Sequence, residues 1–209
     1  MSNIIAILLS TSLGLGHLFA EDPDKQKEKW VHLTQCVTEG NWKVNDEGII
    51  QLQPRHGEQG WKRYGSYLWL RQSYADFICR FEYLHPKGGN SGFYFRVKDK
   101  NNPVETGIEI QILDSFGKKG KLTHHDCGGV IFTQGPAKNM SKPANQWNQM
   151  TVRCVKSHLQ VWLNGEKIQD LQLDKTELNN RPLNGHIGFQ DHGLPMQLRN
   201  ISIQEVSKP

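Results

Sequence analysis

The sequence predicts an all-β fold, built as a sandwich of antiparallel strands or a jelly roll. Three observations support this prediction. Apolar and polar side chains alternate with the period of two that a half-buried strand requires, as in residues 77–83. The pair Asn164-Gly165 stands between two alternating runs, where it tolerates the positive φ angles of a tight hairpin turn. Helical periodicity is nearly absent, and residues 174–180 have room for one short helical turn.

The expected strands follow one another at short intervals, joined by loops that contain Gly and Pro. In chain order the alternating or strand-like runs are residues 77–83, 92–97, 107–115, 148–155, 158–173 (a hairpin), 186–193 and 197–206. The chain has 209 residues, of which 36% are hydrophobic, and this is enough apolar material for one core. We therefore expect a single all-β domain over residues 37–209.

The first twenty residues have the pattern of a secretory signal peptide. An apolar run from Ile4 to Ala20 ends in a small residue directly before the acidic pair Glu21 and Asp22. Residues 21–36 then form a charged linker and lead-in. We expect export to the periplasm or beyond the cell, with no membrane attachment once the leader is cleaved. The alternative is a leader retained as an anchor, although the run is short for a membrane span.

The charge balance does not favour nucleic acid as a partner. The chain carries 25 Lys and Arg against 21 Asp and Glu, for a net charge of +4. A nucleic-acid-binding domain usually shows a basic stripe and a more extreme balance. The sequence also lacks the phosphate-binding and dinucleotide-binding glycine motifs, so nucleotide-dependent chemistry is not expected.

Four cysteines leave the redox state open. Cys36, Cys79, Cys127 and Cys154 allow up to two disulfides, with three possible connectivities, in an exported protein. No pair has metal-ligand spacing such as C-x-x-C. Cys79 and Cys154 lie on the apolar side of expected strands, so buried free thiols are an equally good interpretation.

A row of polar groups runs through the apolar segment "GIEIQILDS", residues 107–115. A regular strand places Glu109 and Gln111 on one face and Asp114 on the other, and a single bulge between Ile112 and Leu113 would return Asp114 to the first face. Two carboxylates and an amide on one concave face could bind sugar hydroxyls or act as acid and base. The alternative is the solvated face of an ordinary strand.

The segment "LTHHDCGG" gathers His124, His125 and Asp126 in a stretch that ends in two glycines. Imidazole and carboxylate groups suit a proton relay or a metal ion. Adjacent residues of an extended chain point in different directions, however, so a polar loop explains the segment equally well.

Two further clusters carry candidate groups. In "GFQDHG" (188–193), Asp191 precedes His192 directly before a turn, where a carboxylate can orient or charge an imidazole. In "GGNSGFYFR" (88–96), Tyr94 and Arg96 share the polar side of a strand and suit a sugar or an anion. Arg96 could equally pair with an acidic residue of a neighbouring strand, such as Glu109.

Tryptophan rings are a further candidate for carbohydrate binding, because they can stack on the apolar face of a sugar. Most tryptophans of a β-sandwich belong to its core instead. Trp61 and Trp69 are the better surface candidates, since they lie close to the polar segment "KRYGSY" (62–67).

Several of these segments together resemble the 3-keto-disaccharide hydrolase family, described as 3-keto-α-glucoside 1,2-lyase / 3-keto-2-hydroxy-glucal hydratase. The resemblance covers about residues 37–206 in the right order. It rests on "WKVNDEGII" (42–50), "YLWLRQSYADFICRFEY" (67–83), "GGNSGFYFRV" (88–97), "GIEIQILDS" (107–115), "NQWNQMTVRC" (145–154), "WLNGEKI" (162–168) and "GHIGFQDHGLPMQLRNISI" (185–203). The resemblance implies a concanavalin A-like jelly roll of two curved sheets and an exported bacterial protein acting on a 3-keto glucoside or disaccharide.

The resemblance also implies a chemistry. A ketone at C3 acidifies the proton at C2, so a base can remove it, the enolate expels the C1 substituent, and water adds to the double bond. On this interpretation Glu109 is the base and His192 or His124 is the acid. Arg96, Gln111 or a bound divalent cation would stabilise the enolate oxygen. The groups expected to orient these residues are Asp114, Asp191, His125 and Asp126.

Two other functions remain open at this point. The first is a laminarinase-like glycosidase, whose bulged E-x-D-x-x-E motif resembles "EIQILD". That mechanism needs two carboxyl groups about 5–5.5 Å apart, and Gln111 with the shorter Asp114 fits it poorly. The second is a lectin-like module that binds carbohydrate without turnover, because fold alone does not decide function.

Overall fold

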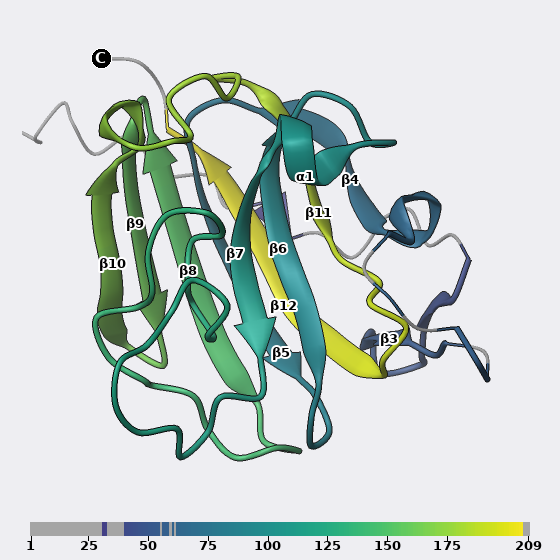
Figure 1. The fold of residues 1–209 in the computed structure, drawn as a ribbon. Helices are drawn as coiled ribbons and strands as arrows, with labels where there is room; N and C mark the ends of the chain where they lie inside the picture. The colour runs from purple at the N-terminus through teal and green to yellow at the C-terminus, as the bar shows by residue number, and fades with distance from the viewer. Residues whose placement is uncertain (1–30, 33–39, 55, 59, 61, 207–209) are drawn as a thin grey trace, which may run out of the picture.

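In the computed structural model, the chain forms two antiparallel sheets packed face to face (Figure 1). The structure describes residues 31–32 and 40–206, except 55, 59 and 61. The predicted signal peptide, most of the predicted linker, Cys36 and Trp61 lie outside the described residues. The all-β jelly-roll prediction is confirmed. Among the described residues, no helix is long and apolar enough to cross a membrane.

The larger sheet has the strand order β10-β9-β8-β5-β12-β3-β2, with β1 paired to β12. Every pairing in it is antiparallel. Its strands are β1 (Val31–His32), β2 (Trp42–Val44), β3 (Ile50–Leu52), β5 (Phe77–Leu84), β8 (Asn148–Val155), β9 (His158–Leu163), β10 (Glu166–Gln172) and β12 (Met196–Glu205).

The smaller sheet has the order β4-β11-β6-β7 and is antiparallel as well. Its strands are β4 (Leu68–Tyr74), β6 (Asn90–Val97), β7 (Ile108–Leu113) and β11 (Gly185–Phe189). The helical elements are short: 3-10 turns η1 (Tyr64–Ser66) and η2 (Leu173–Lys175), and one turn of α-helix, α1 (Pro103–Thr106). Of these, η2 overlaps the segment predicted to form one helical turn.

The core lies between the two sheets and follows from the period of two. Phe81 of the larger sheet stacks on Phe93 of the smaller one, with ring centroids 5.0 Å apart, and meets the edge of Phe189 at 4.9 Å. All three rings are buried. Burying such a side chain contributes about 1.5–3 kcal/mol, so this aromatic contact is a principal link between the layers.

The hairpin prediction is confirmed at Asn164 and Gly165, whose φ angles are 52° and 89°. Positive φ at both central residues is the signature of a type I′ turn, and it joins β9 to β10 as the sequence pattern predicts. Among the other predicted features, Cys127 and Cys154 are buried free thiols, so the alternative with two disulfides does not hold.

Strand β6 contains a bulge that the alternation does not predict. Tyr94 pairs with Gly188 and Val97 with His186, so two residues of β6 oppose one of β11. Arg96, one of the two residues in the bulge, has φ = 52°. Because a bulge reverses the alternation beyond it, Val97 packs against Tyr94, and Arg96 no longer continues the face that Tyr94 begins.

Candidate functional site

The outer face of the smaller sheet holds a pocket of about 340 Å³. Strand residues that point away from the core form its floor, loop 122–134 supplies a wall, and Val104 of α1 lies at one side. The described residues that line it are Asn90, Tyr94, Val104, Glu109, Gln111, His125, Ile131, Phe132, Gln190 and His192.

Glu109 lies at the floor of this pocket because β6 and β7 pair in regular register. Tyr94 is directly opposite Glu109, and the Tyr94 hydroxyl donates a hydrogen bond of 2.6 Å to Glu109 Oε2. Glu109 is only 9% exposed. Burial raises the pKa of Glu109 to about 7, and the hydrogen bond from Tyr94 opposes part of that rise. The carboxyl group therefore changes its charge near neutral pH.

Gly92 makes room for the Glu109 carboxylate. A Cβ atom at position 92 would lie 2.2 Å from Glu109 Oε1 and 2.9 Å from its carboxyl carbon. Any other residue at position 92 would therefore displace the carboxylate, so the missing side chain of Gly92 shapes the floor of the pocket.

Buried tyrosines support Glu109 from one side. The Gln190 amide donates to the hydroxyl of Tyr67 at 3.0 Å and reaches that of Tyr94 at 3.5 Å. Burial and the charge of Glu109 raise the pKa of Tyr94 far above its ordinary value, so its hydroxyl keeps its proton and remains a donor. Gln190 itself is held by its backbone, which donates to Gly92 and accepts from the Ser91 hydroxyl.

On the other side, an amide pair lies at the end of β6. Gln111 Nε2 donates to Asn90 Oδ1 at 2.8 Å. Each amide carries two N–H donors, so the pair offers hydrogen bonds beyond the one it makes internally. These groups can bind hydroxyl or carbonyl oxygens of a ligand in the pocket.

Loop 122–134 is attached to the free edge of β7. Gln111 donates its backbone N–H to Gly129, Gly128 donates to Gln111, and Ile131 donates to Glu109, with N–O distances of 2.8–3.1 Å. This short ladder continues the sheet and places His125, Ile131 and Phe132 beside the pocket. The sequence segment "LTHHDCGG" is thus part of the wall.

His192 lines the pocket from the loop that follows β11. Its ring is half-buried, and the buried Nδ1 atom has no hydrogen-bond partner among the described residues. Burial lowers the pKa of His192, so the imidazole is largely neutral at neutral pH. Because the ring lines the pocket, its imidazole is placed to contact a ligand oxygen or to take part in a proton transfer.

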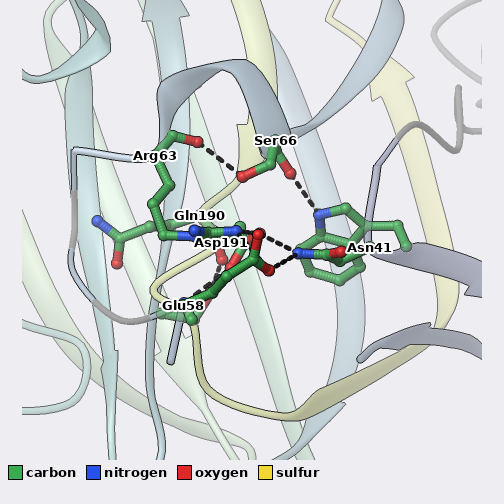
Figure 2. Close-up of polar contacts among 9 residues, drawn as sticks. Asn41, Glu58, Arg63, Ser66, Gln190 and Asp191 are labelled. Carbon is green, nitrogen blue, oxygen red and sulfur yellow. Dashed lines mark hydrogen bonds and ion pairs between the residues drawn. The ribbon is translucent and has the colours of Figure 1, made fainter. Parts of the chain in front are cut away.

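A buried ionic network holds the backbone beside His192 (Figure 2). Asp191 is fully buried and accepts hydrogen bonds from Arg63 at 3.3 Å and Asn41 at 3.4 Å, and from the backbone of Gly193 at 2.7 Å. Glu58 contacts the same two side chains, with distances of 3.1 Å to Arg63 and 2.9 Å to Asn41. Asp191 thus connects the loop of Gln190 and His192 to segments more than a hundred residues earlier.

Several predicted site residues lie elsewhere. The Arg96 guanidinium is buried against Ala75 and Asp76, at 3.3 and 3.4 Å, instead of facing a sugar or Glu109, because of the bulge in β6. Asp114 receives the backbone N–H of Gly88 at 2.9 Å and does not line the pocket. The predicted bulge near Leu113 does not occur in the pairing with β6, which stays regular to the end of β7.

Asp126 and Trp69 also have other contacts. Burial would raise the pKa of Asp126, but its hydrogen bonds with Lys118 and Thr123 hold that pKa below its usual range. Asp126 therefore stabilises the turn that begins at Thr123. Trp69 packs beside Tyr67 with centroids 5.8 Å apart and lies outside the pocket lining.

The two adjacent histidines differ in position. His125 lines the pocket. The ring centroid of His124 lies 4.2 Å from that of His125 and 6.3 Å from that of Phe132. Burial and the neighbouring His125 lower the pKa of His124. Within the described part of the chain, no group of three or more His, Cys, Asp or Glu side chains is placed to hold a metal ion.

Residues 17–204 match the family described as the 3-keto-alpha-glucoside-1,2-lyase-like domain. The chain belongs to this family. The chain is also similar to the 3-keto-disaccharide hydrolase of Bacteroides thetaiotaomicron, with 24% identity over 202 residues. That match covers 78% of this chain and 69% of the relative.

Solved structures agree with the 3-keto-alpha-glucoside-1,2-lyase-like fold. A protein of Parabacteroides distasonis described as a glycosyl hydrolase is similar, with a TM-score of 0.70 and 23% identity. That similarity covers 85% of this chain and 100% of the other. A carbohydrate-binding module of Bacillus subtilis has a TM-score of 0.56 at 13% identity, covering 84% of this chain and 95% of the module. At these identities the likeness concerns the fold.

Sequence reasoning missed part of this lyase-like domain's pocket. Asn90 lies in the segment "GGNSGFYFR" and Gln190 directly precedes Asp191, but neither is predicted from the sequence as a site residue. Gln190 had a usable signal, since alternation along "GFQDHG" separates it from the core residue Phe189. Ile131, Phe132 and Val104 carried no signal, because they come from loops and a single helical turn.

Proposed function

We propose that this protein cleaves 3-keto-glucosides by removing the proton at C2, expelling the C1 substituent and hydrating the resulting double bond. The observation that carries the proposal is Glu109, a buried carboxyl group at the floor of a pocket, whose pKa of about 7 suits a general base. Membership of the family and the name of the Bacteroides relative support the substrate class.

Glu109 takes the C2 proton in the first step of this scheme. A carboxylate with a pKa near 7 is a stronger base than an ordinary one, yet it is still largely ionised at slightly alkaline pH. The C3 ketone makes the C2 proton more acidic, because the electrons of the broken C–H bond are delocalised onto the ketone oxygen as an enolate. Glu109 then holds the proton and returns it to C2 when water adds to C1. Its charge is thereby restored for the next cycle.

His192 serves the departing and arriving oxygens at C1. In its protonated form it gives a proton to the leaving oxygen, and in its neutral form it takes one from the attacking water. Because burial lowers the pKa of His192, the protonated ring is a strong acid but a minor species at neutral pH. Turnover is therefore expected to be highest between the two pKa values, on the acidic side of pH 7. His124, the other predicted acid, lies outside the lining.

The amides of Asn90 and Gln111 are the donors that we assign to the enolate oxygen. Fixed N–H groups stabilise a developing negative charge without reorganisation of solvent. A divalent cation at the same oxygen would act as a Lewis acid. The side-chain oxygen of Gln111 would hold it, because Glu109 has to remain free to accept the C2 proton. The Arg96 side chain is not available for this role, because it is buried against Asp76.

The arrangement favours a lyase over a double-displacement glycosidase. Among the described residues that line the pocket, Glu109 is the sole carboxylate. A retaining glycosidase needs a second carboxyl about 5–5.5 Å away. The residue predicted for that place, Asp114, instead binds the backbone of Gly88.

The direct test is turnover of 3-keto-trehalose and a 3-keto-glucoside, each with and without a chelator. Chelator-sensitive turnover indicates the cation. The Glu109→Gln variant should lose about a thousandfold or more in kcat, since general-base catalysis contributes roughly 10²–10⁴-fold. Glu105→Gln is the matched control, because Glu105 is an exposed carboxylate on α1.

Binding of the keto-sugar without turnover by the wild type would favour a lectin-like module. Full turnover by Glu109→Gln would remove Glu109 from the mechanism. We also propose that the leader in residues 1–20 directs export, which cell fractionation tests.

A further inference from the structure

Phe132 occupies a backbone position that bulky residues avoid. It is the third residue of a tight turn, closed by a hydrogen bond of 3.0 Å from Thr133 N–H to the Val130 carbonyl. Its φ angle is 64°. Positive φ at this position of a turn normally selects Gly or Asn, because the Cβ of other residues is crowded there. Strain of this kind is concentrated at functional sites.

The turn also presents the ring to solvent. Phe132 is 50% exposed, although a large aromatic ring is usually buried. The ring lines the pocket that contains Glu109 and His192. The fold therefore keeps a disfavoured backbone conformation and an exposed apolar ring at the same residue, and both features coincide with the proposed site.

The pocket is divided by chemistry. Glu109, Gln111 and Asn90 form a floor of hydrogen-bonding groups on β6 and β7. Ile131, Phe132 and Val104 give an apolar surface that comes from the wall loop and α1. A ligand that satisfies both parts has a polyhydroxylated ring and an apolar substituent.

We propose that Phe132, with Ile131 and Val104, forms the subsite for the leaving group, and that this subsite selects glucosides with a planar aromatic aglycone. The inference rests on the proposed function and names its substrate class. An aromatic aglycone can stack on the Phe132 ring, and its apolar area is removed from water against the other two side chains. A second sugar ring would leave more hydroxyl groups facing apolar side chains, which is unfavourable.

The test compares two 3-keto substrates, a 4-nitrophenyl glucoside and trehalose. Phe132→Gly removes the ring and suits the positive φ angle, so the turn should persist. We expect about a tenfold loss of kcat/KM on the aryl substrate, mostly through KM, and less than about twofold on 3-keto-trehalose. Phe132→Tyr should restore the aryl activity. Phe116→Ala is the control, since Phe116 is also an exposed ring, at 56%, but lies outside the pocket.

Three results would overturn the subsite. The first is an equal loss of kcat/KM on both substrates, and the second is an unchanged kcat/KM on the aryl substrate. The third is a wild-type dimer that Phe132→Gly converts to a monomer, because the ring would then belong to an interface between copies.

Equilibrium binding of unoxidised 4-nitrophenyl glucoside, measured by calorimetry, separates this inference from the proposed function. If the wild type turns over neither keto substrate, the lyase proposal fails. The subsite is supported in that case if the wild type binds this glucoside more tightly than trehalose and Phe132→Gly abolishes the difference in affinity. Any other binding result contradicts it.

Discussion

Glu109→Gln should stabilise the protein at alkaline pH and leave its stability unchanged at acidic pH. In the folded state the pKa of Glu109 is about 7, against an ordinary value of 4.5. Below pH 4.5 the carboxyl is protonated in both the folded and the unfolded chain, and it contributes no difference. Between pH 4.5 and 7 the folded state holds one proton more than the unfolded state, so the free energy of unfolding falls as pH rises. Above pH 7 the loss is complete.

The size of the loss follows from the difference of the two pKa values, 7 − 4.5 = 2.5. Each unit corresponds to about 1.4 kcal/mol, so the ionised carboxyl costs on the order of 3 kcal/mol of folding free energy. Glutamine has nearly the same shape, can accept the hydrogen bond from Tyr94 through its amide oxygen, and does not titrate. The variant should therefore gain this amount relative to the wild type at pH 8.5 and nothing at pH 4.

Urea unfolding at pH 4, 5.5, 7 and 8.5 measures this difference directly. For a chain of this length, about 3 kcal/mol corresponds to a rise in Tm of roughly 6–12 °C. Subtracting the wild-type curve cancels all other titrating groups, and the exposed Glu105→Gln should show no pH-dependent difference. If the difference in the free energy of unfolding between Glu109→Gln and the wild type is the same at pH 4 and pH 8.5, the pKa of Glu109 is not raised in the folded state. That result would refute the argument for a tuned base.

Three further predictions concern the surroundings of Glu109. Tyr94→Phe removes the hydrogen bond of 2.6 Å that stabilises the charged form, so the pKa of Glu109 should rise by about 1–2 units. Because this pKa lies above that of His192, it sets the alkaline limb of the pH–kcat/KM profile, and that limb should move upward by the same amount. An unmoved limb would show that another group sets it. Gly92→Ala should reduce kcat by at least about tenfold, because its Cβ would displace the Glu109 carboxylate and a misplacement of 1 Å can cost about 100-fold. Gly65→Ala, which has open space, should have no effect, and equal activities would contradict the packing argument. Asp191→Ala should destabilise the fold by about 1–3 kcal/mol in urea unfolding, since it removes the acceptor of the Gly193 N–H and the Asn41 amide, while Arg63 keeps its ion pair with Glu58. A loss below about 1 kcal/mol would mean that the network contributes little.

The extent to which the site could be predicted differs from strand to strand. Along β7, strict alternation placed Glu109 and Gln111 on one face, and the structure has both in the pocket. Along β6 the same rule placed Arg96 with Tyr94, and it was wrong because one bulge reverses the alternation after Tyr94. A bulge inserts a residue without a distinctive local sequence, so only the pairing with β11 reveals it.

Loops were less predictable for a different reason. The segment "LTHHDCGG" indicated a polar cluster, but the structure divides its members. His125 lines the pocket and Asp126 stabilises a turn. The direction of each side chain depends on the backbone hydrogen bonds between this loop and the edge of β7, which connect residues about twenty apart.

By itself the sequence determined the all-β class, the strands from β5 onward, the hairpin at Asn164-Gly165 and the polar face of β7, because these follow from local periodicity and turn chemistry. Only the tertiary structure decided which polar residues work together. Desolvation of Glu109, the space left by Gly92 and the ring of Phe132 at the pocket wall all depend on segments distant in sequence. Burial and close approach are properties of the packed chain, and they are what convert an ordinary glutamate into a candidate base.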